Sequence, residues 1–285
     1  MVTPQRLSVS VNNSLSISVS HFAPAHSTKA PVVCIPGLTR NSADFDDLAP
    51  TLAKLGRDVF VFSLRGRGLS DHDPNFKNYH PSVYRNDIKS AFDILKIHRA
   101  VMVGTSLGGI VTMLLNDDSP HLIVAAVLND IGPELAPAGL ARIGGYVGSV
   151  PSNPVPFDDA LRHIRAINEV AFPNRPQSFW ETFAKRTFRQ KDNGWILNYD
   201  PNIARALTEG APMPDLWGPF KSLAGKPTLV IRGVLSDLLT EDIVEKMQQV
   251  HDGFQTCTVA DTGHAPTLSE ADALASILEF LEPID

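Results

Sequence analysis

Two short stretches near the N-terminus alternate between apolar and polar residues. The apolar positions lie on either side of an Asn-Asn-Ser sequence, at Leu7, Val9 and Val11, then at Leu15, Ile17 and Val19. A period of two is typical of a strand with one buried face, and asparagines favour the tight turn between two such strands. The first 23 residues are therefore predicted to form an antiparallel hairpin.

Beyond the hairpin, the apolar residues come in short continuous runs. They occupy Val32–Ile35, Val59–Leu64, Ala100–Val103, Ile123–Leu128 and Thr228–Ile231, with a weaker run at Thr256–Val259. Continuous runs are typical of strands buried on both faces of a parallel sheet. Helical periodicity appears between them, as in Ser82–Leu95, Leu107–Leu115 and Leu268–Leu281. This alternation predicts right-handed βαβ units, an α/β fold and an eight-stranded, mostly parallel sheet with helices on both faces.

The alternation is interrupted between residues 133 and 222. This stretch holds all three tryptophans and half of the 22 prolines. Helical patterns are visible at Ala160–Val170 and Gln177–Phe188, but no clear strand. We interpret residues 133–222 as a helical insertion into a core made of residues 1–132 and 223–285.

Composition and charge narrow the class of protein. The 285 residues are 43% hydrophobic and 20% charged, which is typical of a globular chain. The net charge of −6 argues against a nucleic-acid partner. No apolar run reaches the roughly 20 residues of a membrane span. Met1–Ser10 lacks the apolar region of a secretory leader, so we expect a cytoplasmic location.

The cysteines and histidines carry no metal-site spacing. Cys34 and Cys257 each lie in an apolar run and are interpreted as reduced core residues. The nine histidines form no H-x-x-x-H pair. We therefore expect neither a metal nor a cofactor.

The strongest chemical motif is Gly104-Thr105-Ser106-Leu107-Gly108. It follows an apolar run and opens a helical pattern, which is the strand–turn–helix setting of a nucleophilic serine. Glycines at both flanks allow a turn too sharp for side chains, and the helix N-terminus behind the serine offers free N–H groups. Ser106 is the candidate nucleophile.

Four motifs together resemble a cap-bearing serine hydrolase of the α/β-hydrolase fold superfamily, similar to carboxylesterases and 3-oxoadipate enol-lactonases. The first, Ile35–Ser42, resembles the oxyanion-hole loop, and the second, Leu64–Asp71, resembles an R-G-x-G-x-S loop. The third is the elbow around Ser106. The fourth consists of Gly233–Asp237 and Gly263–Pro266, which resemble the loops that carry the acid and the histidine. Pro36 departs from the family, in which many members have histidine before the glycine. The resemblance covers nearly the whole chain and implies that residues 133–222 form a cap.

The resemblance also implies roles for single residues. His264 is the general base, and Asp237 the acid that orients it. Asp130, which follows the apolar run 123–128, is the alternative acid. The backbone N–H groups of Leu38 and Leu107 form the oxyanion hole. Arg65 and Arg67 are interpreted as structural.

The leading functional hypothesis is hydrolysis of a small-molecule carboxylic ester or lactone through an acyl-serine intermediate. Trp180, Trp195 and Trp217 are candidates for the substrate pocket, because small-molecule sites are mostly apolar. A C–C bond hydrolase of meta-cleavage products remains an alternative, although Ala265-Pro266-Thr267 stands where that group usually carries tryptophan. A ligand-binding receptor on the same fold is a second alternative.

Overall fold

The computed structural model describes residues 3–27, 29–149, 153–251 and 253–285. Eight strands form one sheet in the order β1-β2-β4-β3-β5-β6-β9-β10. Their bounds are β1 Gln5–Ser10, β2 Ser16–Phe22, β3 Val32–Ile35, β4 Val59–Phe62, β5 Ala100–Thr105, β6 Ile123–Asn129, β9 Thr228–Gly233 and β10 Gln255–Val259. All are within about two residues of the predicted strands.

The hairpin and the parallel sheet are both confirmed. β1 pairs with β2 in an antiparallel register that joins Gln5 to His21, and β2 pairs antiparallel with β4. The remaining neighbours, from β4 to β10, are parallel. A 3-10 turn at Asn12–Ser14 connects the two strands of the hairpin.

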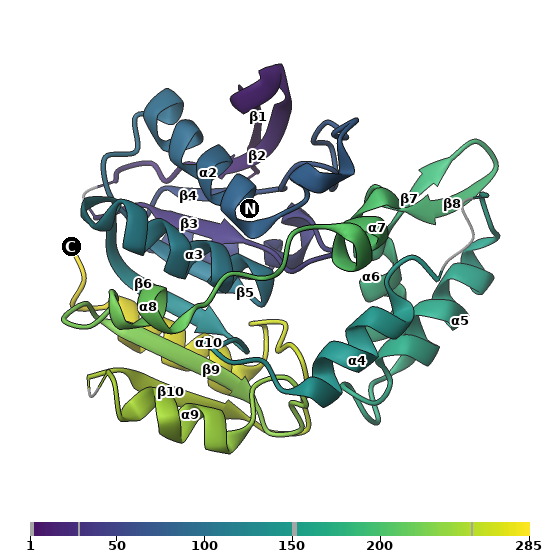
Figure 1. Ribbon diagram of the computed structural model, residues 1–285. Helices are drawn as coiled ribbons and strands as arrows, with labels where there is room; N and C mark the ends of the chain where they lie inside the picture. Colours follow the sequence, from purple (N-terminus) through teal and green to yellow (C-terminus); the bar gives the residue numbers. More distant parts are fainter. Residues whose placement is uncertain (1–2, 28, 150–152, 252) are drawn as a thin grey trace.

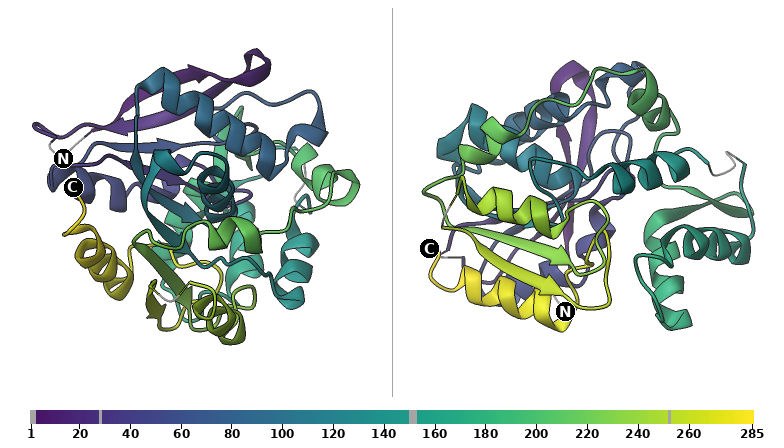
Figure 2. Two further views of the ribbon diagram at one scale, coloured as in Figure 1. Left: turned by 60° about the vertical axis from the view of Figure 1, so that its left-hand side comes forward. Right: turned by 60° about the horizontal axis from the view of Figure 1, so that its bottom comes forward.

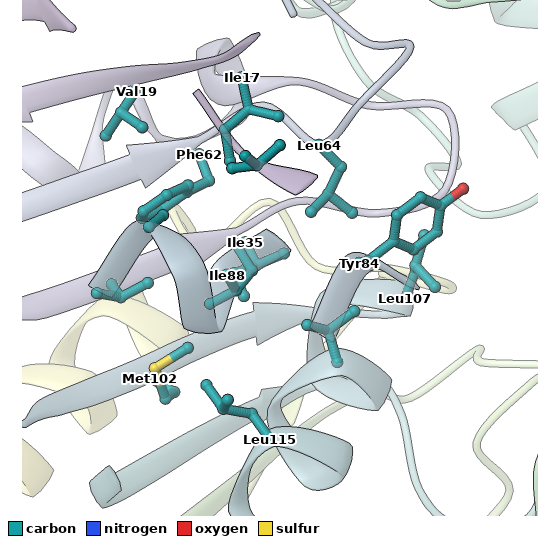
Figure 3. Close-up of a cluster of buried hydrophobic side chains, with 14 of the residues drawn as sticks. Ile17, Val19, Ile35, Phe62, Leu64, Tyr84, Ile88, Met102, Leu107 and Leu115 are labelled. Atoms are coloured by element: carbon teal, nitrogen blue, oxygen red, sulfur yellow. The ribbon is translucent and has the colours of Figure 1, made fainter. Parts of the chain in front are cut away.

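Helices cover both faces of the sheet, which explains the continuous apolar runs. Along β3, Val33 and Ile35 pack toward α2 (Pro81–Leu95) and α3 (Leu107–Asp118). Val32 and Cys34 pack toward α1 (Leu48–Lys54) and α10 (Ala271–Leu281) on the opposite face. Figures 1 and 2 show the sheet between these helix layers. Figure 3 shows side chains of the first layer, including Phe62, Ile88 and Met102.

Residues 133–222 connect β6 to β9, two neighbouring strands. Their elements are α4 Pro137–Tyr146, α5 Phe157–Asn168, α6 Gln177–Thr187, β7 Phe188–Lys191, β8 Gly194–Leu197, α7 Asn202–Glu209 and α8 Trp217–Lys221. α4 to α7 lie beyond the end toward which the parallel strands point, and α8 returns to the sheet (Figure 1). α9 (Glu241–Gln248) follows β9 and packs with α3 and α8 against β6 and β9.

The prediction that residues 133–222 contain no strand is wrong. β7 and β8 form a two-stranded antiparallel sheet that pairs Phe188 with Leu197 and Lys191 with Gly194. Only Asp192 and Asn193 connect the strands, and Asp192 takes a φ of 51°, which aspartate tolerates better than most residues. The pattern was missed because β7 is mostly polar and exposed, so it carries no apolar run.

Candidate active site

Ser106 lies in the sharp turn between β5 and α3. Its φ of 51° and ψ of −115° fall outside the regions that L-residues favour, which is typical of a functionally strained position. A Cβ on Gly108 would lie 2.0 Å from the carbonyl oxygen of Ile35, so only glycine fits there. Thr105, Ser106 and α3 are thus held close to the end of β3.

Two consecutive hydrogen bonds connect Ser106 to His264 and His264 to Asp130. His264 Nε2 lies 2.9 Å from Ser106 Oγ, and His264 Nδ1 lies 2.8 Å from Asp130 Oδ2. The ionised carboxylate only accepts, so Nδ1 carries the proton and Nε2 of the neutral ring accepts from the serine hydroxyl. Asp130 is fully buried and the His264 side chain is 7% exposed. The arrangement has the nucleophile–base–acid geometry of acyl-transfer enzymes.

The expected contact between Asp237 and His264 is not present. Asp237 instead forms a two-point ion pair with Arg142 of α4, with Nε–Oδ2 and Nη2–Oδ1 distances of 2.6 and 2.8 Å. This guanidinium lowers the pKa of Asp237 below its usual range. Asp130 follows β6, which is the direct neighbour of the Ser106 strand, whereas Asp237 follows β9, one strand further away. The alternative acid therefore occupies the position beside the histidine.

Ser236 is a functional candidate that the sequence analysis missed. Its hydroxyl donates to Asp130 Oδ2 at 2.5 Å, the same oxygen that accepts from His264. The Gly233 N–H donates to Asp130 Oδ1 at 2.7 Å, so both carboxylate oxygens are engaged. Ser236 Oγ itself accepts from the Leu238 and Leu239 N–H groups. Ser236 belongs to the motif Gly233–Asp237, which indicated a functional loop, but the functional role was assigned to the neighbouring Asp237.

Leu38 and Leu107 are the residues whose N–H groups are the candidates for the oxyanion hole. Leu107 is the first residue of α3, so its N–H has no carbonyl partner within the helix. Leu38 follows β3, and among the described residues no protein acceptor binds its N–H. Arg67 Nε donates to the Leu38 carbonyl at 2.8 Å and fixes this loop. Neither N–H group has a protein acceptor among the described residues.

The two arginines interpreted as structural are fully buried. Arg65 lies between the carboxylates of Asp73 and Asp87, at 2.5 Å from each. Arg67 also donates to Tyr84 Oη at 2.8 Å. All three guanidinium nitrogens of Arg65 and two of those of Arg67 bind protein groups, whereas Arg67 Nη2 is buried without a hydrogen-bond partner among the described residues.

A cavity of about 120 Å³ opens over Ser106 and His264. Its lining includes the large apolar side chains of Leu38, Phe45, Ile143, Ile164, Ile167, Phe172, Phe183 and Leu197. Burial lowers the pKa of His163 and raises that of Tyr146, two further lining residues. Both side chains are therefore favoured in their neutral forms at neutral pH.

None of the three predicted tryptophans lines this cavity. Trp180 is 1% exposed and packs behind the wall, against Phe172, Phe179 and Phe183. Trp195 packs on Phe157, and Trp217 packs on Phe220 of α8. The three indoles therefore pack against other aromatic side chains of residues 133–222 and lie outside the lining of this cavity.

Arg40 is the charged side chain nearest to the nucleophile in the loop after β3. Its Cγ and Ser106 Cβ both lie within 3.7 Å of the point where a Cβ on Gly37 would stand. Its guanidinium stacks over Phe183, pairs with Asp44 and donates to Thr187 Oγ1. The charge is thus neutralised within the pocket wall.

The described ranges of the chain contain neither a candidate metal site nor a candidate membrane-spanning helix. No group of three or more His, Cys, Asp or Glu side chains in them is arranged to hold a metal ion. No helix in the same ranges is long and apolar enough to cross a membrane. Cys34 and Cys257 are buried and unpaired, as expected.

Comparisons with known proteins identify relatives of this chain. The sequence model of the Alpha/beta hydrolase family matches residues 32–277. The 3-hydroxybutyrate-oligomer hydrolase of Cupriavidus necator is 31% identical over 259 residues, 87% of each chain. The 2-(acetamidomethylene)succinate hydrolase of Mesorhizobium japonicum is 25% identical over 247 residues, 86% of each chain. The solved structure of an alpha/beta hydrolase from Novosphingobium aromaticivorans is 36% identical with a TM-score of 0.92, over 100% of both chains.

Proposed function

Since the chain belongs to the alpha/beta hydrolase family, we propose that it is a serine hydrolase that cleaves a small carboxylic ester or lactone through an acyl-serine intermediate. The observation that carries the proposal is the line of hydrogen bonds from Ser106 through His264 to Asp130. The catalytic acid in this proposal is Asp130, in place of Asp237.

The first half of the reaction forms the acyl-enzyme. His264 Nε2 removes the hydroxyl proton as Ser106 Oγ attacks the carbonyl carbon of the substrate. Asp130 holds the Nδ1–H tautomer and stabilises the imidazolium that forms. When the tetrahedral intermediate collapses, the C–O bond to the leaving group breaks and His264 returns the proton to the alkoxide.

The second half hydrolyses the acyl-enzyme. His264 removes a proton from water, the hydroxide oxygen attacks the acyl carbon, and Ser106 leaves with the proton that the imidazolium carried. In both halves the Leu38 and Leu107 N–H groups receive the negative charge on the carbonyl oxygen. Each such donor is worth about 3–4 kcal/mol of transition-state stabilisation in other hydrolases.

Residues 133–222 act as the cap in this proposal. They supply much of the apolar wall over Ser106, including Ile143, Ile164 and Phe172. The apolar side chains of the cavity suit the acyl part of a small ester or lactone. The named relatives include a hydrolase of 3-hydroxybutyrate oligomers, whose name agrees with a short acyl unit.

A fluorophosphonate probe tests the nucleophile. We expect one covalent adduct by intact-mass analysis in the wild type, none in Ser106→Ala, and an unchanged adduct in the control Ser178→Ala, whose serine is exposed on α6. Hydrolysis of p-nitrophenyl esters and lactones should follow the same pattern. Labelling of Ser106→Ala would refute the assignment, and labelling without turnover of any ester or lactone would refute the substrate class.

A further inference from the structure

The loop that carries His264 is bound by a segment of the proposed cap. The Gly263 N–H donates to the Ala171 carbonyl at 2.6 Å. One residue earlier, the hydroxyl of Thr262 accepts from Arg175 Nη2 at 3.0 Å and donates to the Ala260 carbonyl at 3.1 Å. The two residues that precede the histidine are therefore both held by residues between 171 and 175.

This contact is tightly packed as well as hydrogen-bonded. A Cβ on Gly263 would lie 2.9 Å from the Cα of Ala171, so the two backbones approach more closely than side chains allow. Thr262 is fully buried, and its carbonyl accepts from the Leu235 N–H at 2.9 Å. The loop has little room to shift while the segment stays in place.

The segment is itself fixed by aromatic packing. Phe172 contacts Phe179, Trp180 and Phe183, with ring centroids 5.2 to 6.4 Å apart. The Arg175 guanidinium lies over the ring of Phe179, 5.5 Å from its centroid. Phe172 also lines the cavity above Ser106, so the same segment forms a wall of the pocket and a support for the base.

We propose that residues 171–175 hold His264 in line with Ser106, and that Arg175 is a positioning residue that acts through Thr262. This inference rests on the proposed role of His264 as the base. Proton transfer depends steeply on the placement of the base, so a small shift of the loop slows the chemical step without weakening substrate binding.

The test compares Arg175→Ala, Arg175→Lys and Thr262→Val with the control Arg162→Ala, which removes an exposed arginine of α5 that pairs with Asp159. We measure the rate and final stoichiometry of fluorophosphonate labelling, and kcat and KM for p-nitrophenyl butyrate. Arg175→Ala and Thr262→Val should each slow labelling and kcat about tenfold. Labelling should still reach one adduct per chain, and KM should stay within twofold.

Two further comparisons separate positioning from a general loss of folding. Arg175→Lys keeps a donor and should recover much of the rate. The double variant Arg175→Ala/Thr262→Val should be no slower than either single variant, because both remove the same contact. A merely structural role would lower the melting temperature and the labelled fraction, and leave the rate of the folded fraction unchanged.

The outcomes distinguish this inference from the proposed function. Labelling of wild type and Arg175→Ala at the same rate would overturn the positioning role and leave the nucleophile intact. Additive losses in the double variant would also overturn it. An absence of labelling in the wild type would refute the proposed function, and this inference with it.

Discussion

Asp130 and Asp237 have different hydrogen-bond partners, although both follow the carboxyl ends of neighbouring strands, β6 and β9. Asp130 accepts hydrogen bonds from His264, Gly233 and Ser236, whereas Asp237 pairs with Arg142. We expect Asp130→Asn to lower kcat about 10⁴-fold, because an amide favours the wrong imidazole tautomer. Asp237→Asn should stay within tenfold of the wild type. Ester turnover and thermal melts of both variants test this, and the reverse order would reassign the acid.

We expect the hydrogen bond from the Ser236 hydroxyl to Asp130 Oδ2 to stabilise and orient the Asp130 carboxylate. Hydrogen bonds to charged groups contribute about 1.5–3 kcal/mol. Ser236→Ala removes one of them, and we expect kcat to fall about tenfold or more with little change in KM. Ser178→Ala, which removes an exposed hydroxyl from α6, should leave both constants unchanged. An unaltered kcat in a folded Ser236→Ala protein would contradict a role in orienting Asp130.

Sequence alone indicated the serine and the histidine that lie in hydrogen-bond contact, but its first choice of acid was not the aspartate that contacts the histidine. The elbow around Ser106 is a local structure, because its glycines, strand and helix are consecutive in the chain. The choice between the two aspartates depends on partners that are remote in sequence. Arg142 precedes Asp237 by 95 positions, and His264 follows Asp130 by 134. No sequence pattern within either loop indicates which of these remote residues it contacts.

The nucleophile elbow depends on the contact between α3 and the end of β3. Gly108→Ala would place a methyl group 2.0 Å from the Ile35 carbonyl oxygen, so the helix must move. We expect a loss of about 1–3 kcal/mol in the free energy of unfolding, measured by urea denaturation, together with a large loss of turnover. Gly144→Ala in α4 is the control, since nothing lies within 4 Å of its added methyl group. It should be neutral or stabilising by up to about 1 kcal/mol.

The ion pair between Arg142 and Asp237 ties α4 to the loop after β9. Because the pKa of Asp237 is lowered, the unfolded chain takes up this proton first as the pH falls. The contribution of the pair is therefore complete above about pH 5 and is lost as the pH falls below about 4 through the lowered pKa. We expect Asp237→Asn to cost about 0.5–1 kcal/mol of unfolding free energy at pH 7 and progressively less as the pH falls below about 4. A cost that does not change with pH would contradict this.

The central strands of the sheet were predictable because their continuous apolar runs reflect burial on both faces. Val32–Ile35 is an example, since the alternate residues of β3 pack on opposite helix layers. The strand β7, with the sequence Phe-Arg-Gln-Lys, buries only its first residue. Its pairing is held by backbone hydrogen bonds and a two-residue turn, neither of which leaves an apolar pattern.

For the whole molecule, the apolar side chains that line the pocket predict that turnover depends on the length of the acyl chain. We expect kcat/KM for p-nitrophenyl esters to change more than tenfold between short and medium acyl chains, because the walls are apolar. Ile167→Ala should move the optimum toward longer chains, since Ile167 lines the cavity. Leu207→Ala, on an exposed position of α7, should not move it. A flat profile in the wild type would mean that the cavity does not select the acyl group.

The stretch between β6 and β9 forms hydrogen bonds to two loops near His264. One follows β9, and the other, which carries His264, follows β10. The Ala136 and Gly139 N–H groups donate to the carbonyls of Leu238 and Asp237, each at 3.0 Å. On the other side, Ala171 accepts from Gly263 beside the base. A chimaera that receives this stretch from another hydrolase must therefore reproduce both attachments to keep its rate. Natural exchange of such insertions should accordingly be constrained at these few contact residues, while the rest of the insertion remains free to diverge and to acquire new substrates.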